Sequence, residues 1–179
     1  MEEAIAARRS VREFSDEVVT TAEISQLLWA AQGVTGSGGL RASPSAGATY
    51  PLEVYVARSS GLHHFEPELH GLTQISAKDL RAEIHAAALK QNAVIDAPMV
   101  LIITAVYERT RAEYDDQAER YVDMEAGHAA QNVLLQAVAL DLGGVLIGAF
   151  DDDRLTEILS LPGNESPLYL IPIGHPQKP

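Results

Sequence analysis

Residues 126–152 read AGHAAQNVLLQAVALDLGGVLIGAFDD and combine most of a long helix, a break and a buried strand. The helix is expected from about Tyr114 to Leu142, because apolar residues recur every three or four positions. These positions are Val122, Ala126, Ala129, Val133, Ala137 and Leu140, and Leu134, Leu135 and Val138 add apolar surface on other sides. A helix that is apolar nearly all round must be covered on several sides. We therefore expect both the core and a partner subunit to bury it.

On the C-terminal side, Gly143-Gly144 ends the helix, a strand is expected from Val145 to Ile147, and Asp151 caps a short helix through Leu159. The other expected elements are helices over 1–9, 20–33 and 76–90, strands over 53–58, 99–106 and 168–173, and a hairpin over 63–75. A loop over 33–51 holds five Gly and two Pro. This order predicts an α+β or mixed α/β fold in one domain over 1–179, with at least four strands in the sheet.

The composition narrows the classes of function. The net charge is -12, which disfavours nucleic acid and anionic membranes as partners. The chain has no cysteine, which excludes thiolate nucleophiles and cysteine-based metal sites and fits a cytoplasmic protein. Its first residues, MEEAIAARRS, lack the apolar segment of a signal peptide.

An arginine segment, Arg8-Arg9-Ser10-Val11-Arg12, follows the first expected helix. The planar fork of arginine matches phosphate oxygens, so this segment is a candidate phosphate site. The alternative interpretation is a solvated helix end, whose cations offset the negative end of the helix dipole.

Two further segments are rich in small residues. Residues 43–51, SPSAGATYP, would let a backbone approach a flat ligand closely, or would simply connect two elements. Residues 143–151 end a strand in Gly148-Ala149 just before a helix cap, where free N–H groups would suit a planar, electron-accepting ring. The alternative is an ordinary strand-to-helix turn.

A polar stripe of Glu125, His128, Asn132 and Gln136 follows one side of the long helix. Glu125-x-x-His128 is half of a di-iron signature, but no second histidine is preceded three positions earlier by glutamate. We therefore expect no metal site and interpret the stripe as part of a subunit interface.

The three segments, in this order and spacing, resemble the nitroreductase superfamily of FMN-dependent oxidoreductases. The Arg-x-Ser-x-Arg/Lys box of that family is matched by Arg8, Ser10 and Arg12, and its Pro-Ser-Ser/Ala stretch by residues 44–47. Its late glycine-rich strand is matched by residues 146–149, and its closing Ile-Gly-His-Pro by residues 173–176. The sequences of residues 126–152 and 43–56 are similar to those of the thiazole/oxazole-forming oxidase branch, the SagB/ThcOx type.

The resemblance implies an α+β nitroreductase fold, with a mixed or antiparallel central sheet flanked by helices and the long helix at a dimer interface. It also implies a homodimer that binds FMN at the subunit interface. Arg8 and Ser10 would hold the phosphate with Arg9 beside them, and Arg12 would face the pyrimidine end of the flavin. Contacts from the other subunit would come from Pro44, Ser45, Ala46 and Gly47. The ring would meet Leu146, Ile147, Gly148 and Ala149, with the last two near N5, and Gln91 is a weaker candidate for the pyrimidine edge. Of the basic C-terminal residues that often help to hold the phosphate, the chain offers only Lys178.

The resemblance also implies a reaction. We expect ping-pong transfer of two electrons from NAD(P)H, or an organic donor, through flavin N5 to a small acceptor such as a nitro or quinone compound. No side chain need act as an obligatory acid or base, and Tyr50 and His128 are the weak candidates. Gly148 stands where bacterial nitroreductases carry Glu, which puts their acceptor specificity in doubt. The alternatives are a thiazoline or oxazoline dehydrogenase acting on a peptide-derived substrate and a non-catalytic flavin-binding protein.

Overall fold

The computed structural model describes residues 1–177 and contains one six-stranded sheet in the order β3-β2-β1-β4-β6-β5. All neighbouring strands pair antiparallel. The strands are β1 Leu52–Arg58, β2 Gly61–Glu66, β3 Gly71–Ser76, β4 Met99–Ala105, β5 Gly143–Gly144 and β6 Ser166–Gly174. The prediction of an α+β fold with an antiparallel central sheet is confirmed.

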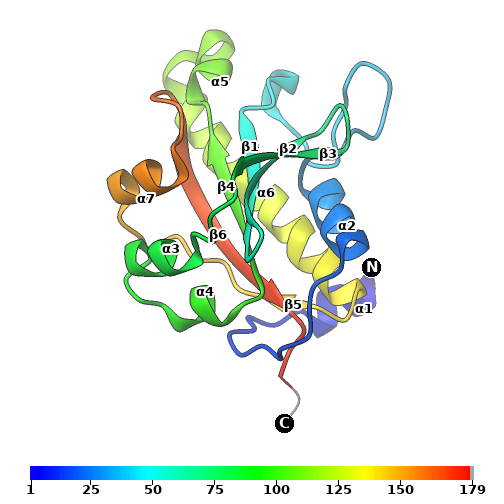
Figure 1. Cartoon of the computed structure of the whole chain (residues 1–179). Helices are drawn as coiled ribbons and strands as arrows, with labels where there is room; N and C mark the ends of the chain where they lie inside the picture. The colour runs from blue at the N-terminus through cyan, green and yellow to red at the C-terminus, as the bar shows by residue number, and fades with distance from the viewer. Residues whose placement is uncertain (178–179) are drawn as a thin grey trace.

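Helices cover both faces of this sheet (Figure 1). The longer ones, α2 and α6, pack on one face, and α3, α4 and α7 pack on the other. The α-helices are α1 Glu2–Ala7, α2 Thr21–Gln32, α3 Arg81–Ala87, α4 Asn92–Asp96, α5 Tyr107–Tyr114, α6 Ala118–Ala139 and α7 Asp152–Leu159. Two short 3₁₀ turns, η1 Ala46–Ala48 and η2 Asp115–Gln117, precede β1 and α6.

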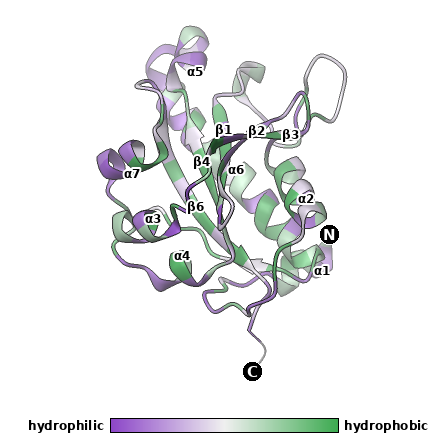
Figure 2. Ribbon diagram, viewed as in Figure 1, coloured by the Kyte–Doolittle hydropathy of each residue, from purple (hydrophilic) through white to green (hydrophobic). Residues whose placement is uncertain are grey.

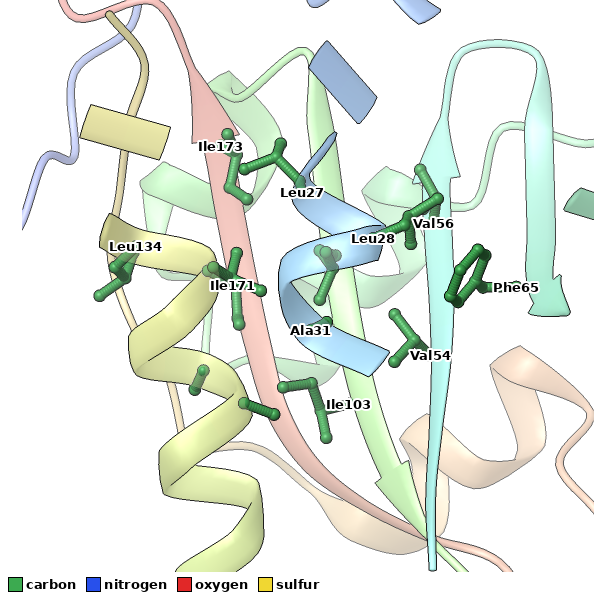
Figure 3. Close-up of a cluster of buried hydrophobic side chains, with 14 of the residues drawn as sticks. Leu27, Leu28, Ala31, Val54, Val56, Phe65, Ile103, Leu134, Ile171 and Ile173 are labelled. Carbon is green, nitrogen blue, oxygen red and sulfur yellow. The ribbon is translucent and has the colours of Figure 1, made fainter. Parts of the chain in front are cut away.

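Strand β4 lies in the middle of the sheet because its sequence, MVLIITA, can be buried on both faces. Figure 3 shows Leu27, Leu28 and Ala31 of α2 packed over Val54 and Ile103 of the sheet. The hydrophobic colour in Figure 2 follows α6 and the strands, whereas α5 and α7 carry hydrophilic residues toward the outside. The core therefore has two apolar layers, one on each face of the sheet.

Several expected element ends differ from the structure. The long helix does not begin at Tyr114, because Asp115 has a φ of +43° and separates α5 from α6. The helix expected over 76–90 begins at Arg81, since Ser76 ends β3 and the carboxylate of Asp79 accepts from the Arg81 N–H. It ends before the left-handed Leu89, and α4 follows as a separate helix.

The strand expected from Val145 to Ile147 is also displaced. Its regular part is Gly143–Gly144, while Ile147 makes one isolated bridge with Leu170 of β6. By contrast, the capping box of Thr20 and Glu23 at the start of α2 is confirmed.

Candidate functional site

The arginine segment runs along the edge of the sheet beside β5. Helix α1 ends at Ala7, Ser10 forms a parallel bridge with Gly144, and the Val11 N–H donates to the Gly144 carbonyl at 3.0 Å. Close approach requires glycine here, because a Cβ on Gly143 would lie 2.6 Å from Cγ2 of Val11. The double glycine thus fixes the arginine segment against the sheet as well as ending the helix.

The three guanidinium groups of this segment have different environments. Arg9 donates to the carbonyls of Ala6 at 2.9 Å and Arg8 at 2.7 Å, so it serves the end of α1, as the alternative interpretation of a helix end requires. Within residues 1–177, no carboxylate lies within 4.0 Å of Arg8 or Arg12, and neither side chain donates a hydrogen bond. Arg8 is half-buried, and Ser10 and Arg12 are exposed. This leaves two cations and a hydroxyl available to an anion.

The turn after Ile147 presents free backbone donors. Both the N–H and the carbonyl of Ile147 bond to Leu170 at 2.9 Å, and its side chain is buried in the core. Gly148 and Ala149 are exposed, and in the described part of the chain no protein acceptor takes either of their N–H groups. Leu146 is half-buried and packs partly on the core. A ligand here would meet the N–H groups of Gly148 and Ala149 and the side chain of Leu146. From Ile147 it would meet only the backbone, because the side chain is buried.

Gln91 holds this turn in place. Its Nε2 donates to the Ala149 carbonyl at 3.0 Å and to the Ala88 carbonyl at 3.1 Å. The predicted ligand contact from Gln91 is therefore limited to its remaining amide oxygen. Gly148 lies four residues after Gly144, roughly 13 Å along an extended chain, so the arginine segment and the free amides share one edge of the fold.

The small-residue segment, residues 44–47, is anchored to the middle of α6. The buried Ser43 donates to the Ala31 carbonyl at 2.9 Å and accepts from Nδ2 of Asn132 at 3.1 Å. Ser45 lies beside the carboxyl of Glu125 and accepts from the Tyr50 N–H at 3.0 Å. Pro44 and Gly47 are exposed, and Ala46 is half-buried at the start of η1.

In one chain, the small-residue segment lies far from the arginine segment. Glu125, beside Ser45, precedes the last helical residue Ala139 by fourteen positions, or about 21 Å of helix axis. The arginine segment lies beyond that end of α6, where Figure 1 shows α1, whereas α5 lies at the opposite end. The structure thus brings residues 8–12 and 144–149 together but leaves residues 44–47 apart from them.

A groove of about 380 Å³ lies between these regions, next to the exposed Trp29. Its walls come from α1, α2, the loop after α2, and α6, and Arg41, Asn132 and Gln136 supply its polar groups. Gln136 and Asn132 belong to the predicted polar stripe, of which His128 is exposed and Glu125 is buried. Within the described residues, no group of three or more His, Cys, Asp or Glu side chains is arranged to hold a metal ion.

Glu125 belongs to the predicted polar stripe, but the sequence did not predict its burial or its raised pKa. It is 3% exposed, and its Oε1 has no hydrogen-bond partner within residues 1–177. Burial raises its pKa to about 7, although the Ser45 hydroxyl and the charge of Arg41 each lower it. The available signal for its burial was its place on the long helix next to the apolar residues Val122, Ala126 and Ala129, which are buried as well.

The two weak catalytic candidates, Tyr50 and His128, are far in sequence from the free amides of Gly148 and Ala149, and their surroundings are different. Tyr50 follows the small-residue segment, and its ring lies 4.8 Å below the guanidinium of Arg41. His128 is exposed on α6, one turn before Asn132. Lys178 lies outside the described residues.

A second polar cluster lies on the other face of the sheet. His64 bonds to Glu53 at 2.8 Å, and Arg109 also donates to Glu53. The hydrogen bond to Glu53 raises the pKa of His64. Burial acts to raise the pKa of Glu53, but the bonds from His64 and Arg109 outweigh it, so the pKa of Glu53 is lowered. Nearby, Thr104 donates to the buried Glu165. This cluster is internally paired, so it stabilises the sheet end rather than presenting free groups.

Comparison with known proteins identifies similar chains. The model of the nitroreductase family matches residues 5–175. A nitroreductase-family protein of Methanocaldococcus jannaschii is 46% identical, with 97% of this chain and 90% of that protein covered. An NADPH-dependent FMN reductase of Bacillus subtilis is 27% identical, with 97% of this chain and 65% of that protein covered.

A solved structure extends the likeness to three dimensions. A nitroreductase-family protein of Ralstonia eutropha superimposes with a TM-score of 0.89 at 32% identity, covering 98% of this chain and 82% of that one. No helix among residues 1–177 has the length and apolar character needed to cross a membrane.

Proposed function

The chain belongs to the nitroreductase family, and on that premise we propose that it is an FMN-dependent oxidoreductase whose cofactor lies between two copies of the chain. The observation that carries this proposal is that cations and backbone N–H groups without a protein partner within residues 1–177 lie along one edge. Arg8, Ser10 and Arg12 offer donors to a phosphate and an anionic ring edge, and Gly148 and Ala149 offer N–H groups further along.

These residues fit the chemistry of FMN at both ends. A phosphate needs cationic or N–H donors, which Arg8 and Ser10 supply. A reduced flavin carries negative charge at its pyrimidine end, which the guanidinium of Arg12 would stabilise. Bound FMN would supply two-electron redox chemistry, with NAD(P)H or an organic donor as the reductant and a small nitro or quinone compound as the acceptor.

The proposed dimer follows from the separation within one chain. Ser45 lies beside Glu125, about 21 Å of helix axis before the end of α6 where the arginine segment lies. A second copy would bring its own residues 44–47 to the first copy's edge. The exposed Trp29, Ile5 and Met124, on α2, α1 and α6, supply apolar surface for such a contact.

The alternative substrate is a thiazoline or oxazoline ring in a peptide-derived molecule, which would give two electrons to the flavin in place of NAD(P)H, while a second substrate or oxygen would reoxidise the flavin. The exposed Gly148 favours it, because a Cβ at this position would meet only Tyr169, at 3.9 Å. An open face beside the free amides would admit a bulky substrate. Such an enzyme would work with a separate partner that forms the ring. For either reaction we propose a cytoplasmic location, where NAD(P)H is available.

The test is a visible spectrum of the purified protein after FMN reconstitution, followed by anaerobic titration with NADH and NADPH. We expect flavin absorbance near ~450 nm that is bleached by at least one of them. A flavin that stays oxidised with both donors would indicate a different donor or a non-catalytic flavin-binding protein. A colourless protein would overturn the proposal.

A further inference from the structure

A buried carboxyl group lies beside the small-residue segment and has no part in the proposed function so far. Glu125 is 3% exposed, and one of its oxygens lacks a hydrogen-bond partner within residues 1–177. A buried carboxylate without partners is costly, so such a group stays neutral or acquires a cation. Which of the two applies to Glu125 depends on the cations that lie near it.

Arg41 is the neighbouring cation, and it is engaged elsewhere. Its guanidinium lies over the Tyr50 ring, donates to Oε1 of Gln32 at 3.2 Å and pairs with Glu68 at 4.0 Å, but forms no ion pair with Glu125. Its Nε is buried and unpartnered. A free donor on Arg41 and a free acceptor on Glu125 thus lie in one cluster without being joined.

The segment above this cluster is conformationally strained. Gly47, Ala48 and Tyr50 have φ values of +59°, +53° and +46°. Left-handed conformations at residues other than glycine persist only where the surroundings hold them. Several contacts hold this segment. The Ser45 hydroxyl accepts from the Tyr50 N–H, Arg41 covers the Tyr50 ring, Arg109 donates to the Tyr50 carbonyl at 2.9 Å, and the hydroxyls of Thr49 and Thr110 bond at 2.8 Å.

We propose that Glu125 is the positioning residue of the flavin site, supporting Ser45 while it is neutral and drawing Arg41 away from Tyr50 when it is ionised. Ionisation would remove the cover from Tyr50 and loosen residues 44–50, which weakens FMN binding. This inference rests on the proposed function, because the segment matters only if it contacts FMN.

The surrounding titratable groups agree with a change near neutral pH. They are Arg41 and Tyr50 in the loop, Glu68 at 4.0 Å from Arg41, Tyr114 on α5, and Tyr121 and His128 on α6. Of these, Arg41 alone alters the pKa of Glu125, which burial raises to about 7. The neutral and ionised forms therefore exchange across the physiological range.

The experiment measures the FMN dissociation constant of the apo-protein by flavin fluorescence between about pH 6 and 8.5, in the wild type, Glu125→Gln and Glu125→Ala. The FMN phosphate titrates equally with all three, so a difference between variants isolates residue 125. We expect wild-type affinity to fall by about tenfold more than that of Glu125→Gln over this range, one pKa unit of coupling. Glu125→Gln should match the wild type at pH 6 and bind about tenfold more tightly than the wild type at pH 8.5, and Glu125→Ala should bind more weakly throughout.

Parallel pH profiles for wild type and Glu125→Gln, with FMN bound, would overturn the inference and leave the proposed function intact. Failure of the wild type to bind FMN at any pH would overturn both. Hydrogen exchange of residues 44–50 in the wild type provides a second readout that needs no variant. We expect faster exchange at pH 8.5 after correction for the intrinsic rate, and equal protection would contradict the inference.

Discussion

The free guanidinium groups of Arg8 and Arg12 distinguish the arginine segment from an ordinary helix end. Arg9 serves the end of α1, as cations near a helix C-terminus commonly do. Its neighbours have no such partner within residues 1–177, although the chain carries 25 acidic residues that could have supplied one. At the scale of the residue, the proposed phosphate site therefore depends on Arg8 and Arg12, which have no other partner within residues 1–177.

The double variant Arg8→Ala, Ser10→Ala should weaken FMN binding by at least about tenfold, since each lost bond to a charged group contributes about 1.5–3 kcal/mol. Fluorescence titration of the apo-protein measures it. Arg154→Ala removes an exposed cation from α7 and serves as the control for net charge. Wild-type affinity in the double variant would show that the phosphate binds elsewhere.

Gly47 should not tolerate a side chain. Its φ is +59°, and a Cβ would lie 2.9 Å from the Tyr114 hydroxyl. We expect Gly47→Ala to lower the free energy of unfolding by about 1 kcal/mol or more. Gly163→Ala, where a Cβ meets nothing within 4 Å, should change it by less than about 0.5 kcal/mol. Urea unfolding compares the two, and equal effects would contradict the strain at Gly47.

The buried Glu125 should make stability depend on pH. Its folded pKa of about 7 lies above its ordinary value of 4.5, so the folded state binds more protons between those values. Stability from this group is full below about pH 4.5 and is lost as pH rises to about 7. Between pH 4.5 and 8, Glu125→Gln should gain up to about 3 kcal/mol relative to the wild type. Urea unfolding at both pH values tests this, and a constant difference would contradict it.

Helix α6 is the element that organises the site. Its middle anchors the small-residue segment through Asn132, and its end delivers the chain to β5 and the arginine segment. The expectation of a long, nearly all-apolar helix could be formed from spacing alone, because burial on several sides leaves that pattern in the sequence. The break at Asp115 could not, since one left-handed residue changes no periodicity.

The same contrast applies to the site residues. The arginine segment and the residues near Gly148 stand out in the sequence because their types are unusual for their positions. The pairing of Ser45 with Glu125, and the use of Gln91 to hold a turn, join positions far apart in the chain. Such contacts depend on tertiary packing, which composition and spacing do not encode. Whether the predicted residues contact FMN stays a prediction.

The anchor on α6 has a measurable contribution. Asn132→Ala would leave the buried Ser43 with one partner fewer, and we expect the free energy of unfolding to fall by about 1–3 kcal/mol. His128→Ala, one turn earlier and exposed, should stay within about 0.5 kcal/mol of the wild type. Chemical denaturation distinguishes them, and a silent Asn132→Ala would mean that the segment is held by other contacts.

At the scale of the whole molecule, one sheet with an apolar layer on each face supports our proposal of a single domain over 1–179. In one chain, residues 44–47 lie beside the middle of α6, whereas the arginine segment lies beyond its C-terminal end. A symmetric dimer resolves this separation, because each copy completes the other's site. The central claim is thus that FMN binds across two chains.

Mixed dimers test that claim most directly. One chain carries Arg8→Ala with Ser10→Ala, the other carries Ala46→Phe to block the small-residue segment, and the two are co-expressed with different tags and purified as heterodimers. Each variant alone should bind little FMN. If the site spans two chains, the heterodimer joins one intact arginine segment to one intact small-residue segment and should bind one FMN per dimer. A heterodimer that binds no more FMN than the separate variants would contradict the account.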